Sequence, residues 1–149
     1  MRRLLVLASA IVFVDTMFFS AVAPLLPDLA DSLGLSKSAA GILSGSYAAG
    51  ALLGSIPGGW LAARVGVKPT VIGALVAMSA SGTVFALGDS VVVLDAARFV
   101  QGFASAATWA GALAWLIGVS PRDRRGEMIG AALGAAVAGA LFGPVLGGA

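Results

Sequence analysis

Residues Ser38–Ala63 read SAAGILSGSYAAGALLGSIPGGWLAA and contain no charged side chain. An apolar stretch of about 20 residues is long enough to cross the hydrocarbon core of a bilayer as a helix. The rest of the chain has the same character, since 59% of its 149 residues are hydrophobic and only 11% are charged. Soluble domains carry about 25% charged residues. The composition therefore predicts a membrane protein.

Charged residues and clusters of glycine and proline divide the chain into five apolar runs. We expect transmembrane helices at about 4–26, 38–63, 70–87, 91–119 and 128–149. A transmembrane β-barrel would show apolar/polar alternation in segments of about ten residues, and no run shows it. The predicted fold class is an all-α, multi-pass membrane protein, with residues 1–149 as one transmembrane domain.

The basic residues predict the orientation of these helices. Seven of the nine lie on one side of the membrane if the spans alternate: Arg2, Arg3, Arg64, Lys68, Arg122, Arg124 and Arg125. The segments on the other side carry Lys37 and three acids: Asp28, Asp31 and Asp89. Cytoplasmic loops are enriched in Lys and Arg, so we expect a cytoplasmic N-terminus.

The chain contains no cysteine and no histidine. This excludes disulfides, Cys/His metal sites and Ser-His-Asp triads. A phosphate-binding loop of the Gly-x4-Gly-Lys-Ser/Thr type is also missing, which argues against an ATP-driven pump. We expect no enzyme activity, no catalytic residue, no metal, no cofactor and no nucleic-acid partner.

Asp15 is the charged residue that interrupts the first run. It lies eleven residues after Leu4, or about 16 Å along a helix, near the middle of a core about 30 Å thick. A carboxylate at that depth costs at least about 2.5 kcal/mol, so ionisable groups there are functional by default. A carboxyl group that changes between charged and neutral forms suits proton coupling, and its anion attracts a cationic substrate. The alternative is an acid paired with another helix for structure alone.

Arg98 and Gln101 lie within the fourth run, where a permanent positive charge is equally unusual. Arg98 can approach a carboxylate on another helix and oppose its protonation. Asp95 stands three residues before Arg98, so a local ion pair within the helix is the alternative.

Four segments of the sequence resemble the major facilitator superfamily, and specifically its proton-linked drug antiporters. Asp15-Thr16-Met17 followed by Pro24-Leu25-Leu26-Pro27 is similar to the first helix of those antiporters. The turn Gly59–Lys68 resembles the superfamily's cytoplasmic signature loop, with Gly59, Arg64, Gly66 and Lys68 in place. The acid expected in that loop is replaced by Ala63.

Two further segments carry the resemblance. Arg98-x-x-Gln101-Gly102 is similar to the family's Arg-x-x-Gln-Gly motif, which is linked to proton transfer. The last run reproduces the antiporter helix motif at its fixed positions: Gly130, Gly139, Gly143, Pro144, Gly147 and Gly148. The resemblance implies proton and substrate coupling by Asp15, Arg98 and Gln101.

The resemblance also implies an incomplete architecture. Five helices would form part of a six-helix N-terminal half, so the sixth helix and the C-terminal half would be missing partners. The implied function is proton-coupled efflux of amphiphilic, cationic small molecules across a plasma membrane, most simply a bacterial one. Substrate, protons and the lipid bilayer are the other implied partners, and the fragment alone is not expected to transport. A proton-coupled nutrient symporter and a non-transporting membrane scaffold are the alternatives.

Overall fold

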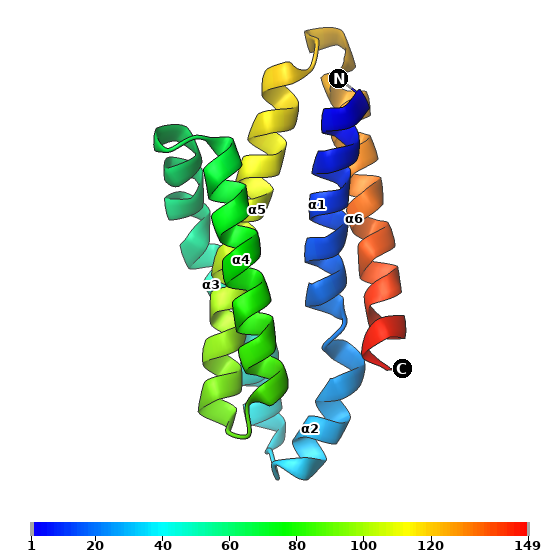
Figure 1. Cartoon of the computed structure of the whole chain (residues 1–149). Helices are drawn as coiled ribbons and strands as arrows, with labels where there is room; N and C mark the ends of the chain where they lie inside the picture. The colour runs from blue at the N-terminus through cyan, green and yellow to red at the C-terminus, as the bar shows by residue number, and fades with distance from the viewer. Residues whose placement is uncertain (1, 149) are drawn as a thin grey trace. The chain divides into compact units, whose positions relative to one another are not determined.

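The structure is a computed structural model that describes residues 2–148. Within this range the chain forms helices and turns and no strand, in this order: α1 (Arg2–Ser20), η1 (Ala23–Leu25), α2 (Leu26–Ser32), α3 (Lys37–Arg64), α4 (Val67–Leu87), α5 (Val91–Val119), η2 (Arg122–Arg124) and α6 (Arg125–Gly147) (Figure 1). Among residues 2–148, five helical segments are long and apolar enough to cross a membrane. The predicted all-α class with five such helices is confirmed.

The predicted membrane orientation and the domain assignment of residues 1–149 stay predictions. The predicted end of the last helix at residue 149 lies outside the described residues. The first predicted span, about 4–26, contains both α1 and the 3₁₀ turn η1. Pro24 lacks the N–H that would continue α1, and Leu25 N–H donates to the Val22 carbonyl at 3.0 Å instead.

The chain divides into two compact units. One contains α1, η1, the end of α5 from residue 112, η2 and α6; the other contains residues 26–111. Each unit is described by itself below.

In the first unit, α1 and α6 lie side by side (Figure 1). Gly139, Gly143 and Gly147 of α6 form a stripe against the backbone of α1 and of Ala21, the residue that follows it. A Cβ on Gly143 would lie 2.5 Å from the Met17 carbonyl oxygen and 2.9 Å from Ala21 N. Lipid gives helices no hydrophobic reason to associate, so close packing of small residues must supply the contact.

One hydrogen bond reinforces this contact between helices. The Thr16 hydroxyl lies 2.8 Å from the Ala136 carbonyl oxygen of α6. Interhelical side-chain bonds in membranes contribute about 0.6 kcal/mol on average, so the bond supplements the packing of the glycine stripe.

In the second unit, α3 packs on α5 through glycines from both helices. A Cβ on Gly54 would lie 2.7 Å from the Phe103 carbonyl oxygen, and one on Gly58 would lie 2.7 Å from Ala107 Cα. A Cβ on Gly102 of α5 would likewise overlap the backbone carbonyl of Tyr47 on α3. A cluster of buried small and flexible residues joins α4 to α5: Ala74, Met78, Ala104 and Ala107, with Ala77 packed against it.

We predict that Gly143→Ala lowers the free energy of unfolding by about 1–3 kcal/mol, because the new methyl group overpacks the contact with α1. Thermal unfolding in detergent measures the effect. Gly134→Ala is the matched control, since a Cβ at Gly134 on the same helix meets nothing within 4 Å. Equal melting temperatures for the two variants would contradict the proposed role of the stripe.

Candidate functional site

Asp15 is buried on α1, with a relative exposure of 1%. The buried residues of that helix are Ala8, Val12 and Asp15, whose spacing places them on one face. The carboxyl group therefore shares a face with apolar side chains. The structure buries this side chain within the protein, and its depth in the membrane and its role in coupling stay predictions.

Arg98 and Gln101 come together on α5. They are three residues apart, which places them on one face of the helix, and Arg98 Nη1 donates to Gln101 Oε1 at 3.0 Å. Each side chain is 3% exposed. The motif thus forms a buried pair in which the amide orients the guanidinium, while its part in proton transfer stays a prediction.

Tyr47 of α3 is a third member of this group that the sequence reasoning missed. The Arg98 guanidinium carbon lies 4.8 Å from the centre of the Tyr47 ring, within the range of a cation–π interaction. The ring is buried. The signal in the sequence was weak: Tyr47 is the one tyrosine of the chain and stands in its charge-free run.

Asp95 bonds to α3 as well. Ser46 Oγ lies 3.4 Å from Asp95 Oδ1 and donates a long hydrogen bond to it. Neighbouring residues of α3, Ser46 and Tyr47, therefore contact the acid and the base of α5. A local ion pair between Asp95 and Arg98 was the alternative expectation from the sequence. In the structure Asp95 contacts Ser46, and Arg98 contacts Gln101 and Tyr47.

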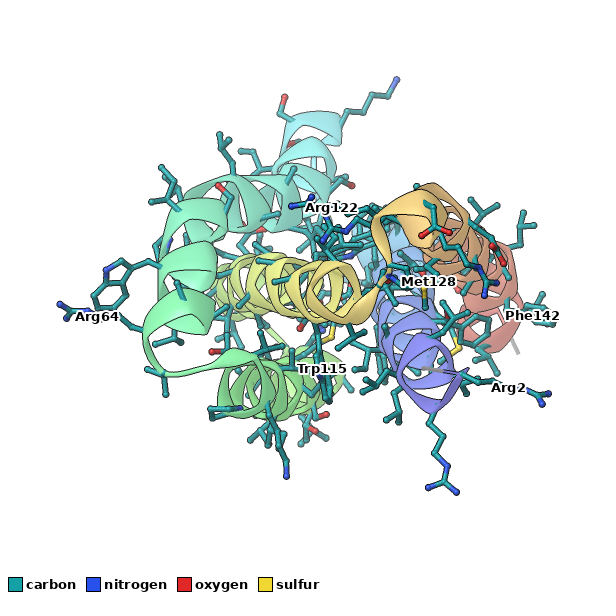
Figure 2. All side chains as sticks on the ribbon, turned by 90° about the horizontal axis from the view of Figure 1, so that it is seen from above. Arg2, Arg64, Trp115, Arg122, Met128 and Phe142 are labelled. Carbon is teal, nitrogen blue, oxygen red and sulfur yellow. The ribbon has the colours of Figure 1, made fainter. Side chains whose placement is uncertain are left out.

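The predicted cytoplasmic gate residues lie at the junction of α3 and α4. Gly59 lies within α3 with open space around it, and Lys68 is exposed in the first turn of α4. Arg64 ends α3, with its guanidinium carbon 5.1 Å from the centre of the Trp60 ring. Figure 2 shows Arg64 extending away from the helices of its own unit.

Gly66 forms the turn of this junction. Its φ of 102° and ψ of 156° belong to a region that is essentially restricted to glycine. The Gly66 carbonyl accepts a hydrogen bond from the Thr70 hydroxyl at 2.8 Å, which ties the turn to the first turn of α4. The backbone conformation of the turn therefore explains why a glycine occupies position 66, apart from any role in a gate.

The six residues of the predicted antiporter helix motif differ in their surroundings. Gly139 and Gly143 contact α1 and Gly147 contacts Ala21 just after it, whereas a Cβ on Gly130 would meet nothing within 4 Å. Pro144 lies inside α6, and Gly148 follows its last residue. The motif therefore contains a packing stripe, and any role in antiport stays a prediction.

The polar groups of the described residues do not gather as metal ligands. Within residues 2–148, no group of three or more His, Cys, Asp or Glu side chains could hold a metal ion. One buried site contains the carboxyl group of Asp15 on α1. The other contains the guanidinium of Arg98 on α5, which contacts the amide of Gln101 on the same helix and the ring of Tyr47 on α3.

Comparison with known proteins gives one consistent result. A sequence model of the Major Facilitator Superfamily matches residues 8–149. An uncharacterised MFS-type transporter of Schizosaccharomyces pombe is 32% identical over 143 residues, which are 91% of this chain and 32% of the relative. The MFS-type transporter ppzB of Metarhizium rileyi is 31% identical over 103 residues, or 69% of this chain and 21% of the relative.

A bacterial protein is similar to the same degree. The quinolone resistance protein NorA of Staphylococcus aureus is 30% identical over 127 residues, which cover 85% of this chain and 33% of that protein. The chain thus spans a third or less of the length of the curated relatives described here.

We predict that Gly66→Ala destabilises the protein by about 1–3 kcal/mol, because the backbone of Gly66 strains any residue with a Cβ. Unfolding by sodium dodecyl sulfate, followed by circular dichroism, measures the loss. Gly59→Ala lies in open space within α3 and should unfold no more readily than the unmodified protein, since Ala favours a helix over Gly. An unchanged curve for Gly66→Ala would contradict the strain argument.

Proposed function

Because the chain belongs to the major facilitator superfamily, we propose that it forms the N-terminal part of a proton-coupled exporter of amphiphilic, cationic small molecules. The family consists of transporters rather than enzymes, in agreement with the expectation from the sequence. The remaining helices of such a transporter are the proposed partner of this chain, because substrate sites in these folds lie between repeats of the bundle.

The observation that carries the proposal is the buried carboxyl group of Asp15, which is 1% exposed on an apolar helix. A charged carboxylate in hydrocarbon costs far more free energy than a protonated carboxyl group does. A site with this property can exchange a proton for a cation as it is exposed to one side of the membrane and then to the other. Asp15 is therefore the proposed proton and substrate site.

The proposed substrate class rests on two considerations. A carboxylate in surroundings of low dielectric attracts a cation more strongly than it does in water. One relative is named a quinolone resistance protein, which supports export of a drug-like molecule. Identity to that relative is 30%, so the substrate class belongs to the proposal.

Arg98 and Gln101 are the proposed tuning pair. The hydrogen bond from Arg98 to Gln101 holds a permanent charge in a fixed place, from which it can favour the ionised form of a carboxylate. We propose a plasma membrane as the location. The relatives described here come from fungi as well as from a bacterium, so they do not single out a bacterial membrane.

Replacement of Asp15 by Asn tests the proposal in the complete transporter that contains this chain. Asn keeps the shape of the side chain but cannot ionise, so efflux of a fluorescent cationic dye driven by a pH gradient should fall about tenfold or more. Dye efflux from proteoliposomes measures the rate. Membrane insertion should be unchanged, and efflux at the unmodified rate would remove Asp15 from the mechanism.

A pair of arginine variants tests the tuning role. Arg98→Ala should lower the same efflux about tenfold or more, because it removes a buried charge together with its hydrogen bond. Arg124→Ala should change efflux about twofold at most, since Arg124 forms an exposed salt bridge with Glu127 at 2.8 Å. If both variants transport normally, Arg98 has no part in coupling.

A further inference from the structure

The guanidinium of Arg98 has two neutral partners in its own unit. Gln101 accepts its hydrogen bond at 3.0 Å, and the face of the Tyr47 ring lies 4.8 Å from its central carbon. The amide bonds the group at one nitrogen, while the ring attracts the cation by its π face. Two contacts from different directions restrict a long side chain that otherwise has many rotamers.

The position of the ring follows from the contact between α3 and α5. Gly102 is four residues after Arg98 and lies on the same face of α5. Its missing side chain allows the backbone of Tyr47 to approach α5 closely. The ring of Tyr47 then reaches back by one helical turn and covers the guanidinium. A glycine of the Arg-x-x-Gln-Gly segment thus determines where an aromatic ring on another helix lies.

An aromatic ring differs from a carboxylate as a partner for this arginine. A carboxylate would neutralise the guanidinium, whereas the π face attracts it without adding a formal negative charge. The nearby acid Asp95 accepts a hydrogen bond from Ser46 of α3. The contacts with Tyr47 and Gln101 therefore restrict the position of the Arg98 guanidinium.

We propose that Tyr47 is a positioning residue for Arg98, and that the π face of its ring holds the guanidinium in the orientation required for transport. The inference rests on the proposed function, since it gives Tyr47 a role through the coupling role of Arg98. In this role the Tyr47 ring acts through Arg98 and binds neither the proton nor the substrate.

A series of fluorinated residues tests the proposal in the complete transporter. Tyr47→Phe keeps the ring and should transport at nearly the unmodified rate. Incorporation of phenylalanine with one, two and three fluorine atoms at position 47 weakens the π face stepwise with little change of shape. Dye efflux should fall at each step, to a rate about 5-fold below that of Tyr47→Phe. The variants should stay folded at the assay temperature, because the shape of the ring and its packing are preserved.

The same series at Phe85, a buried ring of α4, is the matched control and should leave efflux unchanged. A flat series at position 47, or an inactive Tyr47→Phe variant, would overturn the role of the ring. In both cases active unmodified protein would keep the proposed function intact. Absence of proton-driven efflux from the unmodified protein would instead overturn the proposed function and this inference with it.

Discussion

Close contact between helix backbones, made possible by glycine, is the constraint on which both units depend. In lipid the helices gain no hydrophobic energy by meeting, so they must gain dispersion energy by approaching closely. The contacts of Gly54 and Gly102 between α3 and α5, and of Gly143 between α1 and α6, have no room for another methyl group. The polar and aromatic contacts between α3 and α5, and the hydrogen bond between α1 and α6, form within the spacing that these glycines allow.

The buried polar groups use this spacing. Ser46 and Tyr47 reach Asp95 and Arg98 because α3 and α5 are close enough for short polar and aromatic side chains to meet across the interface. In the other unit, the Thr16 hydroxyl reaches the Ala136 carbonyl for the same reason. A charge in hydrocarbon is tolerated only when nearby groups stabilise it, so the small residues are a condition for the polar site as well as for the fold.

The sequence predicted the fold well because each apolar run is long and the turns between runs are polar. It named Arg98 and Gln101 as one motif but expected a carboxylate as the partner of Arg98, whereas the structure shows a hydrogen bond between the two, which share a helix face. It could not predict which glycines pack. Gly41 and Gly45 of α3 are also four residues apart, yet a Cβ on either would meet nothing within 4 Å.

Tyr47 shows the same limit for the candidate site. Its contact with Arg98 depends on how two helices separated in sequence are rotated and shifted against each other. Periodicity within one helix carries no information on that register. The end of α1 at Ser20 is a smaller example, because Pro24 indicates a break nearby without fixing its exact residue.

The Thr16 hydroxyl can donate one hydrogen bond and has three carbonyl oxygens within hydrogen-bond distance. Besides the Ala136 oxygen on α6, it lies 2.8 Å from the Val12 oxygen and 3.1 Å from the Phe13 oxygen on its own helix. If α1 and α6 separate, the Thr16 hydroxyl can rotate and donate its hydrogen bond to either of these oxygens. The hydroxyl therefore keeps a hydrogen-bond acceptor in the apolar medium. The hydrogen bond between the two helices can therefore break and form again. Breaking it costs far less free energy than exposing an unbonded polar group to lipid.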